Sequence, residues 1–244
     1  MALLHVQEMV KHFGGIKAVD GCSFSVEEGT ITAMIGPNGA GKTTVFNLIC
    51  GIQQLDSGTV SFDNTPIHHL QPHQITRKGI ARTFQISRGL MDLTVLENLI
   101  VHSPTRGLLD LLKNTMLSHE KDRAMELLDF MGITHLANAK AGSLSFGQKK
   151  LMEIASALMA EPRFILLDEP AGGINPALLE QIIERIKLLN KQGITFLIVE
   201  HNMEMVMTLC NPVIVMAYGK LLVQGPPREV QNNQLVLDSY LGGA

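Results

Sequence analysis

The chain has 244 residues, 45% of them apolar, and a formal net charge of −3 with a pI near 6.3. This length and apolar content allow one large domain, or a core with a subdomain, around a buried core. The slightly acidic balance argues against a nucleic-acid partner, which usually requires a basic face on the protein.

The cysteines and the apolar runs indicate a compartment. Cys22, Cys50 and Cys210 are scattered without a C-x-x-C pair, which fits a reducing environment better than a disulfide framework. Residues 1–13 lack the basic start and long apolar stretch of a signal peptide. No run of about 18 apolar residues is present to span a membrane. We therefore expect a cytosolic protein whose membrane role, if any, comes through a partner.

The predicted elements begin with two strands, at residues 2–10 and 22–26, separated by a turn at Gly14-Gly15. We expect them to form an antiparallel side sheet. Four short apolar runs bounded by Gly or Pro follow, at residues 31–35, 164–167, 194–199 and 213–216. Runs without alternation are typical of central strands that are covered on both faces.

Helical patterns lie between these strands. The clearest one follows Asn175, a suitable N-cap, and Pro176, a suitable first helical residue, and it ends before Gly193. Strands that alternate with helices predict an α/β fold with a mostly parallel sheet. Residues 87–160 hold helical patterns and no convincing strand. We expect a single domain of residues 1–244, in which 1–86 and 161–244 form the α/β core with its β side sheet and 87–160 form a helical subdomain.

The first chemical motif lies between a predicted strand and a predicted helix and matches G-x-x-x-x-G-K-[ST]. Its glycines let backbone N–H groups face phosphate oxygens, and the helix start adds partial positive charge. The lysine can reach the β- and γ-phosphates of ATP, and the following threonine can bind Mg²⁺. A glycine-rich turn that only caps a helix is the simpler alternative, and the flanking strand and helix disfavour it. The motif residues are Gly36, Pro37, Asn38, Gly39, Ala40, Gly41, Lys42 and Thr43, followed by Thr44.

The predicted strand at 164–167 ends in two acids, Asp168 and Glu169. Alone, this pattern most simply indicates a strand end that meets solvent. Downstream of a phosphate-binding loop it gains a second meaning, because such enzymes need an aspartate at a neighbouring strand end to hold Mg²⁺. Asp168 fits that role, and Glu169 is placed to orient or deprotonate the attacking water.

A second anion site is predicted at the start of another helix, at Ser145, Phe146, Gly147 and Gln148. A phosphate held by its own loop does not need this site, whereas the phosphate of a second chain does. The segment with Leu144 resembles the signature motif of ABC ATPases, usually L-S-G-G-Q, with Phe146 in place of the first glycine.

The resemblance to ABC ATPases implies roles for further residues. Phe13 would stack on adenine, with Val19 close by. Gln85 would touch Mg²⁺ and sense a membrane partner, and His201 would contact the γ-phosphate. Asn175 stands where this family usually has the aspartate of the D-loop. Two chains would enclose two ATP molecules between them.

Segments 81–85, 94–99, 199–203 and 239–242 are similar to the ATP-binding subunits of branched-chain amino-acid importers. Subunits for urea uptake and lipopolysaccharide export are close relatives of these. The resemblance implies a peripheral ATPase on the cytoplasmic face of the membrane. Its partners would be a second ATP-binding subunit, identical or homologous, integral membrane permease subunits and an extracytoplasmic solute-binding protein.

Two other functions are weighed against transport. A soluble ABC ATPase of translation or DNA repair usually carries two ATPase halves or a long coiled coil, and this chain has one P-loop and no sustained heptads. A non-catalytic, nucleotide-gated assembly module is disfavoured by Glu169 together with His201. For the transporter, we expect Ile86, Arg88, Leu90 and Met91 to line a groove that receives a short helix from the membrane subunit.

Overall fold

The computed structural model describes residues 1–83, 90–103 and 118–241, and two β-sheets organise them. The larger sheet has six strands in the order β10-β9-β3-β8-β7-β6, all parallel except β10. The strands are β3 (Ile31–Ile35), β6 (Ile80–Arg82), β7 (Phe164–Asp168), β8 (Thr195–Val199), β9 (Val213–Ala217) and β10 (Lys220–Gly225). The predicted α/β fold with a mostly parallel sheet is therefore confirmed.

The parallel strands are mostly apolar because both faces of the sheet are covered. In β3, Ile31, Ala33 and Ile35 point into one hydrophobic cluster, whereas Met34 points into the other. Side chains alternate between faces along a strand, so an unbroken apolar run supplies both clusters. All five residues of β3, β7, β8 and β9 are buried.

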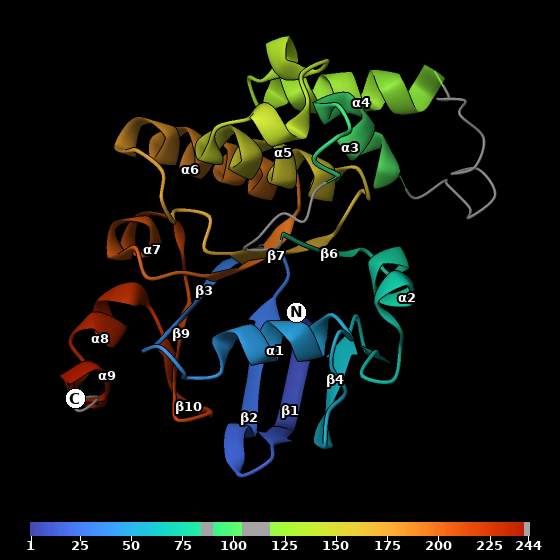
Figure 1. Ribbon diagram of the computed structural model, residues 1–244. Coiled ribbons are helices and arrows are strands. Elements are labelled where there is room, and N and C mark those ends of the chain that lie inside the picture. Colours follow the sequence, from blue (N-terminus) through green and yellow to red (C-terminus); the bar gives the residue numbers. More distant parts are fainter. Residues whose placement is uncertain (84–89, 104–117, 242–244) are drawn as a thin grey trace.

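The smaller sheet has the order β2-β1-β4-β5 and is antiparallel, as expected for the side sheet. Its strands are β1 (Ala2–Phe13), β2 (Ile16–Glu27), β4 (Ser57–Phe62) and β5 (Thr65–Pro66). Helix α1 (Lys42–Ile49) shares a hydrophobic cluster with both sheets and joins them, as Figure 1 shows. The short α2 (Pro72–Arg77) follows β5.

The other face of the large sheet is covered by helices. In the described part between β6 and β7 these are α3 (Val95–Val101), α4 (Ser118–Phe130) and α5 (Phe146–Leu158), with 3₁₀ helices at Thr134–Leu136 and Ala141–Ser143. They gather at one end of the molecule, beside α6 (Pro176–Lys191), as Figure 1 shows. The last helices in the described chain are α7 (Met203–Leu209), α8 (Pro227–Gln231) and α9 (Gln234–Leu241). As predicted, Asn175 caps α6 by accepting from the N–H of Leu178 at 2.9 Å. Among the described helices, none combines the length and apolar character needed to cross a bilayer.

A buried ion pair ties the edge of the large sheet to α1. Arg82 ends β6 and Asp168 ends β7, and Nη2 of Arg82 lies 2.9 Å from Oδ2 of Asp168. The other terminal nitrogen of the guanidinium, Nη1, donates to Oδ1 of Asn47 in α1 at 2.6 Å. The two charged side chains are only 6% and 2% exposed. The pair therefore fixes the position of Asp168 relative to the helix that follows the phosphate-binding motif.

Removing the cation from this pair leaves a carboxylate in the core without its partner. We expect Arg82→Met to lower the free energy of unfolding by about 3–5 kcal/mol in urea titrations. Adding Asp168→Asn should recover part of the loss, because the buried charge is then removed. Arg163→Met is the matched control, because Arg163 pairs with Asp63 and Glu28 while 48% exposed. It should lose about 1 kcal/mol or less. Equal losses in the two single variants would contradict this account.

Candidate functional site

The candidate site lies where three parallel strands end together. Met34 is in register with Val199, and Val199 is in register with Asp168. The loops after β3, β7 and β8 therefore leave the sheet side by side. Ligands of open α/β sheets usually bind outside this carboxyl edge.

The loop after β3 has the backbone shape of a phosphate cradle. Gly36 and Gly41 have φ of 151° and 100°, and a Cβ on either would collide with a backbone carbonyl, that of Met216 or that of Ala18. Each of the two positions therefore accepts only glycine. Asn38, Gly39 and Thr43 are exposed, whereas Ala40 is buried. The loop thus presents backbone and a hydroxyl to the outside while its ends are held against β9 and β2.

Helix α1 begins without a side-chain cap. Gly41 occupies the N-cap position, and no acidic residue lies in the first turn. By contrast, α3, α5, α6 and α7 each begin with a side chain that accepts a backbone N–H. The first N–H groups of an α-helix need an acceptor, and an anion is well suited to supply it. This helix start therefore fits a phosphate group.

Lys42 is folded over the loop. It is only 6% exposed, and its Nζ donates to the carbonyls of Gly36 at 2.7 Å and Pro37 at 3.0 Å. Burial lowers the pKa of the Lys42 ammonium, while the charges of Glu169 and Asp168 act in the opposite direction. An anion on the loop would offer this ammonium a stronger acceptor than two carbonyls.

Asp168 has one carboxylate oxygen to spare. Its Oδ2 accepts from Arg82, and its backbone N–H donates to Oγ1 of Thr83 at 3.3 Å. Its Oδ1 is buried and has no hydrogen-bond partner among the described residues. An orphaned buried oxygen is costly unless a ligand satisfies it. Together with the exposed hydroxyl of Thr43, this oxygen fits Mg²⁺, which prefers oxygen ligands and keeps several waters.

Glu169 and His201 meet at the same edge. Oε1 of Glu169 lies 3.0 Å from Nε2 of His201, with side chains 23% and 52% exposed. Both follow strand ends, Glu169 directly after β7 and His201 two residues after β8. A carboxylate and an imidazole in contact with each other and with solvent can accept or pass on a proton.

A buried acid next to His201 fixes this arrangement. Glu200 is 1% exposed and accepts three backbone N–H groups: Ala171 at 2.6 Å, His201 at 2.9 Å and Asn202 at 3.0 Å. It thereby ties the segment after Glu169 to the loop that carries His201. Sequence reasoning missed this residue. Its signal was an acid directly after an apolar strand.

The second predicted anion site begins α5. The Ser145 side chain accepts from the N–H of Gln148 at 3.3 Å, and Oε1 of Gln148 accepts from the N–H of Ser145 at 2.9 Å. Phe146 is 53% exposed. A Cβ on Gly147 would collide with Leu178 of α6. Because α5 packs into one hydrophobic cluster and α1 into the other, the two helix starts belong to opposite faces of the large sheet.

The remaining predicted residues are placed as follows. Phe13 ends β1 at the turn and is 43% exposed, with Nζ of Lys11 5.6 Å from its ring centre. Val19 is fully buried in β2. Gln85 lies outside the described residues.

Sequence reasoning also missed two buried cations at the site. Arg82 lies in the segment 81–85 that resembles importer subunits, but no role was predicted for it, although its guanidinium pairs with Asp168. Lys150 is 5% exposed, and its Nζ donates to the backbone carbonyl of Glu169 at 3.0 Å. A single sequence carries little signal for either residue, because their partners lie 86 and 19 positions further along the chain.

Comparisons with known proteins agree with this geometry. A family model described as ABC transporter matches residues 19–172. A probable branched-chain amino acid transport ATP-binding protein of Archaeoglobus fulgidus is 39% identical over 247 residues, which cover 99% of this chain and 96% of that protein. The resemblance to this group of importer subunits is thereby confirmed.

Solved structures share the fold over nearly the whole chain. The ADP conformation of MJ1267, an ATP-binding cassette of an ABC transporter, superimposes with a TM-score of 0.90 at 38% identity and covers 99% of both chains. A dimeric post-hydrolysis state of the cassette MJ0796, bound to ADP and Pi, gives a TM-score of 0.80 at 27% identity, covering 92% of this chain and 99% of that one. The chain therefore belongs to the ABC transporter family and is an ATP-binding cassette.

Proposed function

We propose that the chain is the ATP-hydrolysing subunit of an importer for branched-chain or other hydrophobic amino acids. The observation that carries the hydrolytic part is the 3.0 Å contact between Glu169 and His201 at the strand edge beside the phosphate loop. The substrate class is supported by the relative from Archaeoglobus fulgidus, whose name gives branched-chain amino acid transport.

The phosphate loop would bind ATP in place of its present internal contacts. The uncapped N–H groups of α1 would donate to the β- and γ-phosphates, and Lys42 would exchange the carbonyls of Gly36 and Pro37 for phosphate oxygens. Phe13 is exposed at the end of β1 and would stack on adenine, with Val19 on the paired strand β2.

Hydrolysis would use Glu169 as the base. A water oxygen attacks the γ-phosphorus while Glu169 takes a proton from that water, and the bond from the γ-phosphorus to the bridging oxygen breaks to leave ADP and phosphate. His201 would leave Glu169 and donate to the γ-phosphate. Mg²⁺, held by Thr43, Gln85 and Asp168, would neutralise charge on the phosphates.

A second ATP-binding subunit, identical or homologous, would complete each site. Ser145, Phe146, Gly147 and Gln148 of one chain would meet the γ-phosphate held by the loop of the other. Support comes from the placement of the two helix starts, which belong to opposite faces of one sheet. In the proposed site one γ-phosphate would contact both kinds of helix start, so the second would come from a partner chain. The dimeric state of the cassette MJ0796 is consistent with such pairing.

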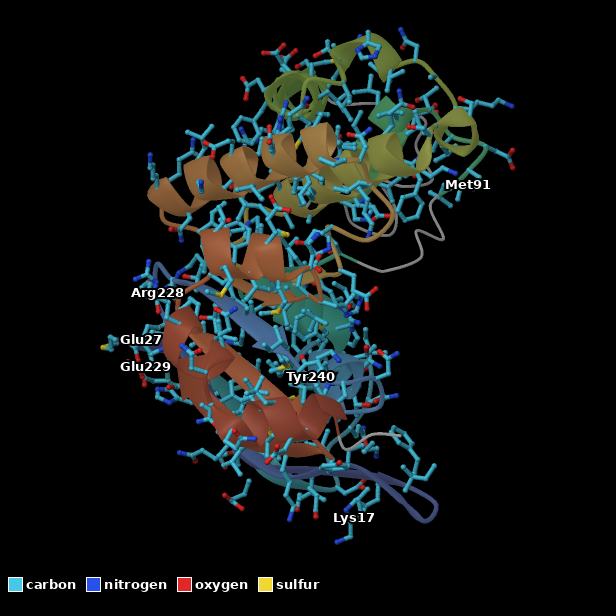
Figure 2. The ribbon with its side chains drawn as sticks, turned by 90° about the vertical axis from the view of Figure 1, so that its left-hand side faces the viewer. Lys17, Glu27, Met91, Arg228, Glu229 and Tyr240 are labelled. Atoms are coloured by element: carbon cyan, nitrogen blue, oxygen red, sulfur yellow. The ribbon has the colours of Figure 1, made fainter. Side chains whose placement is uncertain are left out.

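The surface near α3 would receive the permease. Leu90 is 50% exposed and Met91 40% exposed, and Figure 2 shows Met91 at the edge of the helical part, far from Lys17 in the side sheet. The Leu90 backbone is nonetheless fixed, because the buried Asn98 side chain accepts its N–H at 3.2 Å and donates to its carbonyl at 3.1 Å. An apolar side chain held outward on a fixed backbone suits a docking helix. Ile86 and Arg88, proposed for the same groove, lie outside the described residues.

The full system would place this subunit on the cytoplasmic face of the membrane, bound to integral permease subunits and served by an extracytoplasmic solute-binding protein. Residues 87–160 would form the subdomain that passes motion to the permease, and residues 1–86 and 161–244 the core that binds ATP. Support for this division comes from the helices α3, α4 and α5, which follow one another in the described chain between β6 and β7.

The role of Glu169 is tested by Glu169→Gln, which keeps the size of the side chain but removes proton acceptance. We expect hydrolysis to fall by roughly 10²–10⁴ while ATP binding persists. The variant should accumulate as an ATP-bound dimer in gel filtration with Mg-ATP. Glu180→Gln, on the exposed side of α6, is the control and should behave as wild type. Turnover near wild type in Glu169→Gln, with only monomer in the column, would contradict the proposal.

The docking surface is tested by Leu90→Glu. A carboxylate there cannot be buried against an apolar helix without a large desolvation cost. We therefore expect uptake of radiolabelled leucine by cells with the complete importer to be lost, while the isolated subunit still hydrolyses ATP. Leu188→Glu is the matched control, since Leu188 is 47% exposed on α6. Normal uptake by Leu90→Glu would exclude this placement, and equal loss in both variants would show a general defect.

A further inference from the structure

The backbone of Glu169 is held in a conformation that glutamate rarely adopts. Its φ is 49°, in the left-handed region that disfavours residues with a Cβ. Such a conformation persists only where the surroundings determine it. Here the N–H of Glu169 donates to the carbonyl of Val199 at 2.9 Å, and its carbonyl accepts the N–H of Gly172 at 3.2 Å.

A third contact on the backbone of Glu169 comes from Lys150, in the second turn of α5. Nζ of Lys150 donates to the Glu169 carbonyl at 3.0 Å and lies 5.7 Å from the ring centre of Phe146. The side chain is 5% exposed, and in the described part of the chain no carboxylate forms an ion pair with it. A buried ammonium is costly unless it is compensated. Its observed compensation is the backbone of the proposed base and the face of an aromatic ring.

The same helix start also touches the segment after Glu169. A Cβ on Gly173 would lie 3.0 Å from the Phe146 ring, so the ring packs directly over this glycine. Phe146 directly follows Ser145, the N-cap of α5. Helix α5 is therefore joined to the segment of Glu169 at two places, through the Lys150 ammonium and through the Phe146 ring.

We propose that Lys150 is a positioning residue, which holds the carbonyl of Glu169 and thereby keeps its carboxylate turned toward the site. The inference rests on the proposed function, in which Glu169 is the base and the start of α5 meets the partner's nucleotide. The helix that binds the partner's nucleotide then also holds the base of its own chain. Without the ammonium, Glu169 can return to an ordinary φ, and its carboxylate moves away from His201.

The test is Lys150→Met, which keeps the length and apolar contacts of the side chain but removes the donor. We expect kcat for ATP hydrolysis to fall about tenfold, with KM for ATP within about twofold of wild type. Lys150→Arg keeps a cationic donor and should restore most of the rate. Lys149→Met is the matched control, because Lys149 is the partly exposed neighbour on the same helix, and it should hydrolyse ATP as wild type does.

A second measurement separates positioning from a general structural role. If Lys150 acts through Glu169, then Lys150→Met should cause no further loss of single-turnover rate in a Glu169→Gln background. ATP-dependent dimer formation in that background should also be unchanged.

Three outcomes would overturn the inference. They are a wild-type kcat in Lys150→Met, a loss that Lys150→Arg does not relieve, and a further loss in the Glu169→Gln background. If Glu169→Gln alone hydrolyses ATP slowly and forms an ATP-bound dimer, these outcomes reject only the role of Lys150 and leave the proposed function intact. A fast Glu169→Gln single variant would instead reject the proposed function itself.

Discussion

The parallel register of β3, β8 and β7 is the constraint on which the site depends. Met34, Val199 and Asp168 lie opposite one another, so the three loops that follow leave the sheet at one level. This register is fixed by side chains that alternate between two buried clusters, and a shift by one residue would exchange the two faces. The apolar core therefore determines where the phosphate loop, the two acids and His201 can meet.

Three buried cations then fix the polar groups at this edge. The side chains of Lys42, Arg82 and Lys150 are each 6% exposed or less, and each comes from a different element: the start of helix α1, strand β6 and helix α5. Arg82 neutralises the Asp168 carboxylate, whereas Lys42 and Lys150 donate to backbone carbonyls. Arg82 and Lys150 thus hold the two acids of the site in place before a substrate arrives. In the proposed function only Lys42 would change partners, from two backbone carbonyls to the phosphate oxygens of ATP.

The sequence was informative where a motif is local and less so where a contact joins distant segments. The phosphate loop and the Asn175 cap each depend on neighbouring residues, so their local patterns predict them. The interpretation of Asp168 and Glu169 also needed the phosphate loop upstream, because the two acids alone indicate only a strand end that meets solvent. Strands β1 and β2 extend to the turn at Gly14-Gly15, further than predicted. The added residues mix polar and apolar side chains, with Lys17 and Asp20 beside Ile16 and the buried Val19, and so lack a clear strand pattern. Arg82, Lys150 and Glu200 take their importance from burial beside partners in other elements. The approach of Phe146 to Gly173 is likewise visible only in three dimensions.

A crosslink between chains tests most directly the claim that each site is shared. One chain carries Asn38→Cys in the exposed part of the phosphate loop and the other Ser145→Cys, both with Glu169→Gln and Mg-ATP. Gly39 is less suitable for a cysteine because its φ is 79°. The native cysteines can stay, because burial raises the pKa of Cys22 and Cys50 to about 11 and of Cys210 to about 12, so their thiols are unreactive near pH 8. The shared site predicts a disulfide-linked dimer only when the two chains are mixed with ATP. If a chain that carries both cysteines instead forms a disulfide only within itself, and no linked dimer, the shared site is contradicted.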